Sequence, residues 1–318
     1  MRVARRRALP GAVRAARHSC HDSAGSPGDD TRVTRTTARL GSTATRDRAT
    51  AVGLVLVACT SPQIGAVFAI TLFDELGPAG AAFLRLTFAA VVLWAIWRPR
   101  LAGDLRLPVA FGVSLGLMNW SFYEAISRIP LAIAVTIEFA GPLLVAVIGS
   151  RRPLDLLWVV LAAAGIVLLV GPGGDAVDPV GVAFALAAAV CWMAYIYLSK
   201  RTGAVFPGGS GLALAMAVGA LIVLPAGVLQ GGGAFAQPQL LGTALIVALA
   251  SSVLPYSLEL EALRRIPESV FGVLMSIDPA VAALVGFIAL GQELGLRELV
   301  AIAMVVVASA GAAALSHR

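Results

Sequence analysis

Four polar side chains lie deep inside long apolar stretches of this sequence. They are one guanidinium, two carboxyls and one amide, at Arg85, Glu138, Asp278 and Asn119. An ionisable group at bilayer depth costs at least ~2.5–3.5 kcal/mol, so it normally meets a partner or faces a cavity. A guanidinium can bind a carboxylate, and a carboxyl can bind an ammonium group or carry a proton. The pattern predicts a polar site within apolar surroundings, although Arg85 and Glu138 could also form a purely structural ion pair.

Aromatic side chains accompany these polar groups. Trp120 and Tyr123 follow Asn119 closely, and the spacing of four residues places Tyr123 on the same helical face as Asn119. Tyr256 follows Pro255 in a later apolar stretch. Aromatic faces attract cations such as an ammonium group, so these residues could complete a binding site for a zwitterion.

Each of the two acids precedes a proline inside its apolar stretch. The sequence reads E-F-A-G-P from Glu138 and D-P from Asp278. Proline lacks an N–H, frees the carbonyl four residues before it and bends a helix. Freed backbone at membrane depth is tolerated where it lines a cavity or is buried in protein. We therefore predict that one central cavity is lined by the candidate substrate-binding residues Arg85, Asn119, Trp120, Tyr123, Glu138, Tyr256 and Asp278.

The stretches that carry these residues have the length and composition of membrane-spanning helices. The 318 residues are 58% hydrophobic and 13% charged, with a mean hydropathy of +0.88, whereas soluble domains carry about 25% charged residues. This composition excludes an ordinary soluble enzyme, a disordered chain and a nucleic-acid-binding module. About 20 apolar residues cross ~30 Å of hydrocarbon. We predict an all-α membrane protein with ten transmembrane helices, at 52–72, 79–97, 108–127, 131–149, 155–171, 180–199, 211–230, 239–260, 268–290 and 296–315.

The basic residues indicate which ends of these helices face the cytoplasm. Eleven of the 24 basic residues are arginines in the first 50 positions. With the N-terminus inside, 21 basic residues lie on the inner side, and only Arg128 and Arg297 lie on the outer side. A bias of this kind sets the orientation of a membrane protein. We expect a multi-pass protein of the plasma (inner) membrane with both termini in the cytoplasm.

The sequence repeats itself at an offset of 137 residues. E-A-I-S-R-I-P at 124–130 matches E-A-L-R-R-I-P at 261–267, and the same offset aligns Pro142 with Pro279. Because five helices are an odd number, a second five-helix unit enters the membrane upside down relative to the first, as in many secondary transporters. The predicted organisation is a disordered Arg-rich cytoplasmic tail at 1–50 and two inverted five-helix repeats at 51–175 and 176–318.

The sequence gives little support to metal binding or enzyme catalysis. The three histidines lie outside the apolar stretches, and the three cysteines share no metal-ligand spacing. The sequence contains no G-x-S-x-G, H-E-x-x-H or Walker motif. We therefore expect no enzyme activity, no metal and no cofactor, and the lipid bilayer rather than nucleic acid as a partner.

Four stretches carry a family likeness: G-V-S-L-G-L-M-N-W-S-F-Y-E-A-I, I-P-L-A-I-A-V-T-I-E-F-A-G-P-L, S-R-R-P-L-D-L-L-W-V-V-L-A and L-P-Y-S-L-E-L-E-A-L-R-R-I-P. They resemble the drug/metabolite transporter superfamily, EamA type, and within it the threonine/homoserine exporter branch. The resemblance covers about residues 51–315. It implies ten helices in two inverted halves, a central cavity and export driven by an ion gradient. The long Arg-rich tail departs from the family pattern.

We thus expect a secondary active transporter that exports a small-molecule substrate by alternating access, with the proton as the coupling ion. The expected substrates are small amino acids or related metabolites such as threonine or homoserine. Arg85 would bind the substrate carboxylate, and Glu138 or Asp278 would bind the ammonium group. Two alternatives stay open: export of lipophilic drugs or aromatic metabolites on the same fold, which Phe139 and the other aromatics would permit, and a non-transporting membrane scaffold. The oligomeric state is not predicted.

Overall fold

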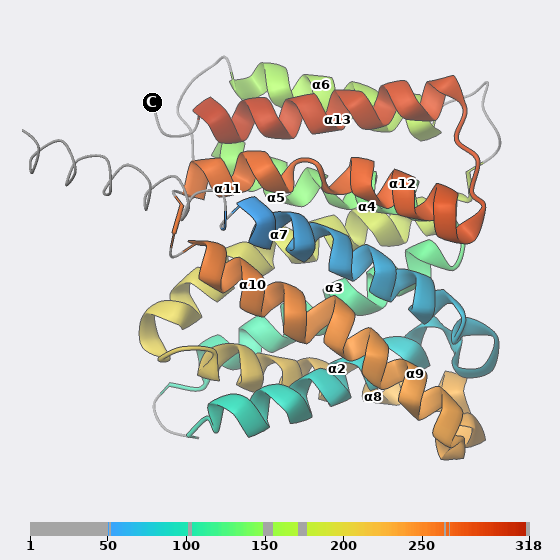
Figure 1. Ribbon diagram of the computed structural model, residues 1–318, viewed down its shortest axis with the longest axis vertical. Coiled ribbons are helices and arrows are strands. Elements are labelled where there is room, and N and C mark those ends of the chain that lie inside the picture. The colour runs from blue at the N-terminus through green and yellow to red at the C-terminus, as the bar shows by residue number, and fades with distance from the viewer. Residues whose placement is uncertain are drawn as a thin grey trace, which may run out of the picture. The chain divides into compact units, whose positions relative to one another are not determined.

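The computed structural model describes residues 50, 52–100, 104–148, 155–170, 177–263, 265–266 and 268–315. The predicted tail at 1–50 lies outside the described residues except for Thr50, as do the connections at 149–154 and 171–176. Within the described ranges every regular element is a helix (Figure 1).

The helices follow the predicted apolar stretches closely. In the first half of the chain they are Val52–Ile70, α2 (Phe73–Trp97), α3 (Arg106–Ile126), α4 (Leu131–Glu138), α5 (Ala140–Ile148) and α6 (Asp155–Val170). In the second half they are α7 (Pro179–Val205), α8 (Ser210–Gly231), a 3-10 segment (Gly232–Ala236), α9 (Pro238–Ala248), a π segment (Leu249–Val253), α10 (Leu254–Leu263), α11 (Glu268–Met275), α12 (Asp278–Leu290) and α13 (Leu296–Leu315).

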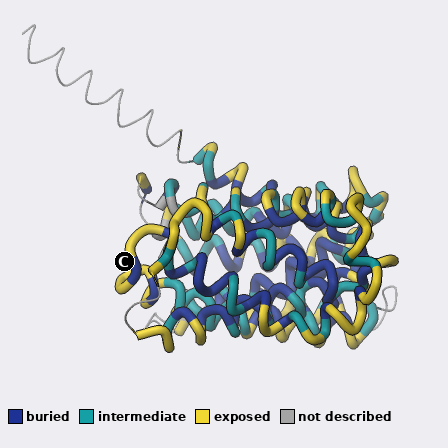
Figure 2. Tube along the Cα trace, turned by 90° about the horizontal axis from the view of Figure 1, so that it is seen from below, coloured by how far each residue is buried: buried dark blue, intermediate teal, exposed yellow. Residues whose placement is uncertain are grey.

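The lengths and compositions of these helices are those of a membrane protein. Among the described residues, seven helices are long and apolar enough to cross a membrane, and two further apolar helices are shorter. Large apolar side chains such as Leu229, Ile288 and Leu296 are more than two-thirds exposed on the outer surface. Buried residues instead gather between the helices (Figure 2). An apolar outer surface is suited to lipid rather than to water, so the chain is a multi-pass α-helical membrane protein.

Two of the predicted continuous helices are broken near their centres. The stretch predicted at 131–149 forms α4 and α5, with Phe139 between them. The stretch predicted at 268–290 forms α11 and α12, which are separated at 276–277. Pro142 has no N–H to donate to the carbonyl of Glu138, and Pro279 has none for the carbonyl of Met275, which explains why regular helix stops at both places.

A third proline disturbs the helix that was predicted at 239–260. Here the chain stays helical, but five residues, Leu249–Val253, form a π segment between α9 and α10. Pro255 lacks the N–H that would donate to the carbonyl of Ser251. Insertions of this kind free backbone carbonyls and are frequent at functional sites.

Glycines allow several of the helices to pack at close range. Helix α3 packs against α7 and α8, and α2 packs against α8. A Cβ atom on Gly116 of α3 would lie only 2.8 Å from the carbonyl oxygen of Gly219 in α8. Small residues at such contacts let two backbones approach closely, as is common in membrane helix pairs.

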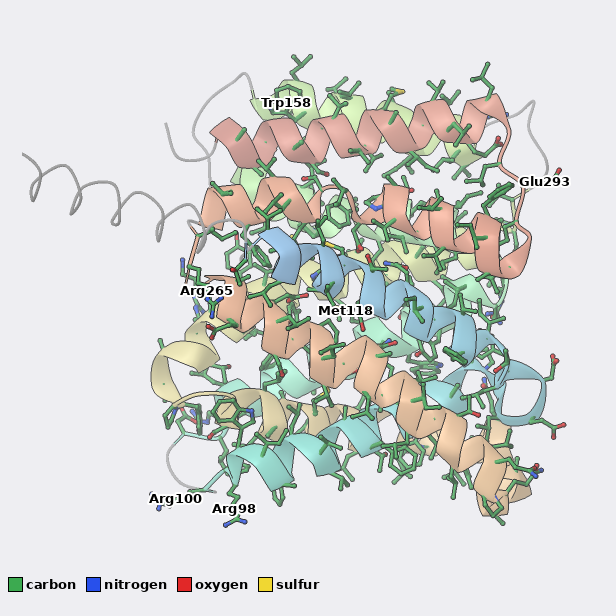
Figure 3. All side chains as sticks on the ribbon, viewed as in Figure 1. Arg98, Arg100, Met118, Trp158, Arg265 and Glu293 are labelled. Carbon is green, nitrogen blue, oxygen red and sulfur yellow. The ribbon has the colours of Figure 1, made fainter. Side chains whose placement is uncertain are left out.

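The charged residues mark the two ends of the helices. Figure 3 shows Arg98, Arg100 and Arg265 at one end and Glu293 at the opposite end. We call these the basic end and the acidic end. Helices α2 and α10 finish at the basic end, and α4 begins at the acidic end (Figures 1 and 3).

Candidate functional site

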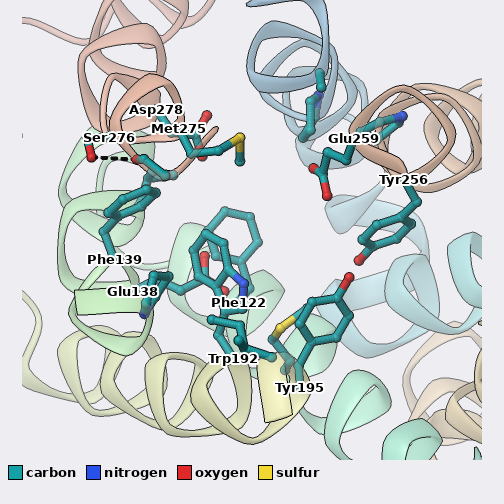
Figure 4. Close-up of a pocket in the computed structure, with 18 of the residues that line it drawn as sticks. Phe122, Glu138, Phe139, Trp192, Tyr195, Tyr256, Glu259, Met275, Ser276 and Asp278 are labelled. Carbon is teal, nitrogen blue, oxygen red and sulfur yellow. Dashed lines mark hydrogen bonds between the residues drawn. The ribbon is translucent and has the colours of Figure 1, made fainter. Parts of the chain in front are cut away.

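A cavity of about 500 Å³ lies between helices from both halves of the chain. In the close-up of Figure 4, Tyr256 and Glu259 lie on one wall, and Glu138, Phe139 and Asp278 lie across the cavity from them. This volume lies within the ~300–1,000 Å³ typical of small-molecule pockets. The helix breaks and the π segment described above all contribute to its walls.

Arg85 of α2 is a buried cation at this cavity, held by neutral groups. Its Nε donates to Ser252 Oγ at 3.0 Å, and its Nη2 donates to the carbonyl oxygen of Ser251 at 2.7 Å. The third donor, Nη1, reaches the hydroxyl of Tyr123 at 3.4 Å, and the guanidinium carbon lies 5.4 Å from the centre of that ring. The carbonyl of Ser251 is the one that Pro255 leaves without its usual helical donor, so the π segment explains where Arg85 is anchored.

Glu138 and Asp278 lie beside the helix breaks, and both are 8% exposed. Asp278 is the first residue of α12, where the positive end of the helix dipole favours a negative charge. Its Oδ1 accepts a hydrogen bond from Gln63 Nε2 at 3.1 Å. Glu138 is the last residue of α4, and its side chain hydrogen-bonds to no other described residue.

The structural ion pair considered for Arg85 and Glu138 is not formed. The ion pairs that join described residues are Arg128–Glu124 and Arg265–Glu261. Arg85 uses its donors on Ser251, Ser252 and Tyr123 instead. Glu138 therefore stays available to a ligand in the cavity.

The remaining predicted site residues separate into two groups. Asn119 and Tyr256 line the cavity together with Arg85, Glu138 and Asp278. Tyr123 does not line it, because it is fully buried behind Arg85 and packs against Phe73. Trp120 does not line it either: it lies about 100° around α3 from Asn119, and its Nε1 donates to Glu124 at 3.2 Å.

Two of the cavity residues that the reasoning from sequence missed are a carboxyl and an amide. Glu259 of α10 lines the cavity one turn after Tyr256, and the spacing of three residues was the signal that places both on one face. Gln63 of the first helix is the partner of Asp278. Its signal was weaker: S-P-Q interrupts an apolar stretch, but nothing local connects that stretch to a residue 215 positions away.

The cavity is lined by equivalent positions of the two halves. Eight pairs of lining residues are separated by the same 137 positions that relate the repeated motifs. The pairs are Ala58 and Tyr195, Pro62 and Ser199, Met118 and Pro255, Asn119 and Tyr256, Phe122 and Glu259, Val135 and Gly272, Glu138 and Met275, and Phe139 and Ser276. Equivalent positions of the two halves thus line the same cavity, although the side chains differ.

This arrangement can bind a small molecule that carries one negative and one positive group. Arg85 offers a guanidinium for an anionic group, while Glu138, Glu259 and Asp278 offer carboxyls for a cationic group or a proton. Within the described ranges no three His, Cys, Asp or Glu side chains are grouped as metal ligands.

Comparisons of the chain with known proteins find similar transporters. Residues 179–313 match the EamA-like transporter family. The chain is 45% identical over 264 residues to the threonine/homoserine exporter RhtA of Escherichia coli strain K12, covering 81% of this chain and 89% of that protein. It is 44% identical, with the same coverage, to the threonine/homoserine exporter RhtA of Salmonella typhimurium strain LT2.

A solved structure shows that the fold is shared more widely. A crystal structure of a protein that is 19% identical in sequence matches 87% of this chain and 99% of its own chain, with a TM-score of 0.57. At this identity the likeness concerns the fold alone. The sequence matches carry the assignment: this chain belongs to the EamA-like transporter family and is a membrane transporter of small molecules.

Proposed function

We propose that this protein is a secondary active transporter that exports threonine, homoserine or closely related small amino acids across the plasma (inner) membrane. The 45% identity to a threonine/homoserine exporter supports this substrate class. The observation that supports the proposal is the cavity, which is lined by the anchored guanidinium of Arg85 and by the carboxyls of Glu138, Glu259 and Asp278. A zwitterionic amino acid needs both kinds of group.

In this proposal different residues of the cavity bind the two charged groups of the substrate. Arg85 binds the substrate carboxylate, because its position is fixed by Ser251 and Ser252. Glu138 binds the ammonium group, because it has no hydrogen-bond partner among the described residues, whereas Asp278 already accepts from Gln63. Charge-assisted hydrogen bonds of this type are about twice as strong as neutral ones.

Coupling to the proton gradient is the second part of the proposal. The cavity holds three carboxyls for one guanidinium, so one carboxyl can exchange a proton while another holds the substrate. Asp278 suits this proton exchange, because the amide of its partner Gln63 can both donate and accept hydrogen bonds. The amide can donate to the Asp278 carboxylate and can accept from the protonated acid, so either charge state of Asp278 keeps a partner.

The topology we propose is ten spans in two inverted five-helix repeats, residues 51–175 and 176–318, preceded by a cytoplasmic tail at 1–50. The eight pairs of cavity residues at the 137-residue offset support this symmetry. The basic end of the helices is proposed to face the cytoplasm, with both chain termini on that side. The two halves then alternate in opening the cavity to either side, as inverted-repeat transporters do.

A second candidate cargo is an aromatic metabolite or a lipophilic drug. The cavity wall carries Phe122, Phe139, Trp192 and Tyr195 (Figure 4), and Phe139 and Trp192 are in edge-to-face contact. The cavity volume of about 500 Å³ also exceeds what a four-carbon amino acid fills. These two observations favour a cargo larger than threonine.

Uptake of labelled threonine into inverted membrane vesicles tests the proposal. With the vesicle interior made acidic, we expect uptake that depends on the protein and collapses when a protonophore removes the gradient. Competition by unlabelled homoserine, but not by an aromatic amino acid, would favour the first cargo. Efficient competition by the aromatic compound alone would favour the second. Uptake that is unaffected by the protonophore would refute proton coupling.

A further inference from the structure

The cavity is closed toward the acidic end of the helices by packed side chains. Four side chains near that end are at most 1% exposed: Leu72 in the turn before α2, and Leu76, Tyr123 and Leu131 in the parts of their helices near that end. The lining extends in the other direction instead, to residues near the basic ends of their helices, namely Ser199, Glu259, Phe271 and Ala313.

A glutamine of the second half binds the first half at this closed end. Gln230, near the end of α8, accepts at Oε1 from the backbone N–H of Ala79 at 2.8 Å and donates through Nε2 to Glu124 at 3.1 Å. Ala79 lies in the first turn of α2 after the break at Gly77, where backbone N–H groups have no partner within the helix. Gly77 makes room: a Cβ there would lie 2.4 Å from Gln230 Oε1.

A second glutamine repeats this arrangement. Gln292 follows α12, and its Oε1 accepts from the backbone N–H of Leu131 at 3.1 Å. Leu131 is the first residue of α4, and the residue before it, Pro130, provides no side-chain cap. Each glutamine thus caps the start of a helix that belongs to the other half of the chain.

From these contacts we propose that Gln230 and Gln292 form the outer gate of the transporter. The inference rests on the proposed alternating access of the two halves, with the acidic end outside. The three hydrogen bonds join halves that must separate at this end for the cavity to open outward. The two caps join neutral amides to backbone N–H groups, and the bond from Gln230 to Glu124 is a single contact to a carboxyl, so none of the three is an ion pair and all of them can break in every cycle. Buried salt bridges in the same place would resist that motion more strongly.

The gate is tested by the accessibility of a buried reporter. Ala82 of α2 is 0% exposed and lies one turn from Arg85 toward the acidic end. The reporter is Ala82→Cys in a full-length chain in which the three native cysteines are replaced by serine or alanine. A membrane-impermeant maleimide is added to intact cells, and the labelling rate is measured.

Loss of both caps should favour the outward-open state. We expect Gln230→Leu with Gln292→Leu to raise the labelling rate about tenfold or more, the scale of effect that loss of helix caps produces. Gln292→Glu should label like the parent, since a carboxylate still accepts from Leu131 at the positive end of α4. The matched control is Gln239→Leu, because Gln239 is exposed at the start of α9 near the same end.

Several outcomes would overturn the gate. One is an unchanged labelling rate in the folded double variant, and another is an equal rise in Gln239→Leu. If Gln292→Leu fails to fold while Gln292→Glu folds, and the folded Gln230→Leu labels like the parent, the caps are merely structural. Labelling needs no substrate, so wild-type threonine uptake in vesicles reports on the proposed cargo independently. If the protein takes up no threonine while the double variant still raises the labelling rate, the proposed cargo is wrong and the gate stands.

Discussion

Replacing Glu138 by Gln separates a transport role from a structural one. The change keeps the size and the hydrogen-bonding capacity of the side chain but removes its titratable charge. In the structure Glu138 is 8% exposed and bonds to no other described residue, while Arg85 is held by Ser251, Ser252 and Tyr123. The substitution therefore leaves no protein group without its partner.

The two roles predict effects of different size on stability. Breaking a buried ion pair costs ~3–5 kcal/mol, which corresponds to a fall in melting temperature on the order of 10 °C. Because Arg85 does not pair with Glu138, we expect Glu138→Gln to change stability by less than ~1 kcal/mol. Transport should respond much more strongly. Loss of a charge-assisted hydrogen bond to the substrate ammonium, ~1.5–3 kcal/mol, lowers uptake at low substrate concentration roughly 10- to 150-fold.

The assay compares threonine uptake in inverted vesicles with thermal unfolding in detergent. Both are measured for Glu138→Gln, for Arg85→Gln and for the double variant. Glu261→Gln serves as the matched control. Glu261 lies at the basic end in an exposed pair with Arg265, at 37% side-chain exposure, and pairs of this kind contribute only ~0–1 kcal/mol.

Two results would refute this reasoning about Glu138. The first is normal uptake by Glu138→Gln, which would move the ammonium site to Glu259 or Asp278. The second is a fall of about 10 °C in melting temperature that Arg85→Gln restores together with uptake. That rescue would identify a structural pair between Arg85 and Glu138.

Three further changes test other parts of the structure. Gln63→Leu removes the donor to Asp278, so we expect a loss of ~1–3 kcal/mol in thermal stability together with weaker threonine uptake. Gly116→Leu forces α3 away from α8, because a Cβ would already lie 2.8 Å from the carbonyl oxygen of Gly219. It should cost at least ~2 kcal/mol and reduce the monodisperse fraction in gel filtration. Deleting residues 1–45 should leave uptake and melting temperature unchanged at matched expression, since this polar segment has no apolar stretch to bury.

Each of these changes has a clear control. Gly203 is exposed in α7, and a Cβ there meets nothing within 4 Å, so Gly203→Leu should be tolerated. Equal damage from both leucine substitutions would show that close packing of α3 on α8 is not the cause. Gln63→Glu retains polarity but adds a second acid beside Asp278, so wild-type uptake by that variant would argue against a required donor at this position. Failure of the truncated chain to insert would give the tail a structural role.

Much of the architecture followed from local properties of the chain. Apolar stretches of about 20 residues predicted where the helices lie, and the prolines after Glu138 and Asp278 indicated where helical backbone would be disturbed. The sequence also showed that Arg85 and Asn119 had to face a cavity or a partner, because a polar group in an apolar stretch is costly. These inferences succeed because hydropathy, helix length and proline geometry act over a few neighbouring residues.

The pairing of polar groups was decided by the tertiary structure. Sequence reasoning offered Glu138 as a structural partner of Arg85, whereas the structure pairs Arg85 with Ser251 and Ser252, and it could not connect Gln63 to Asp278 across 215 positions. It also placed Trp120 and Tyr123 at the cavity, whereas the rotation and the depth of α3 put both behind its wall. Which groups meet depends on how distant helices turn and pack against one another. Periodicity along a single helix gives its faces but does not say which neighbour each face meets.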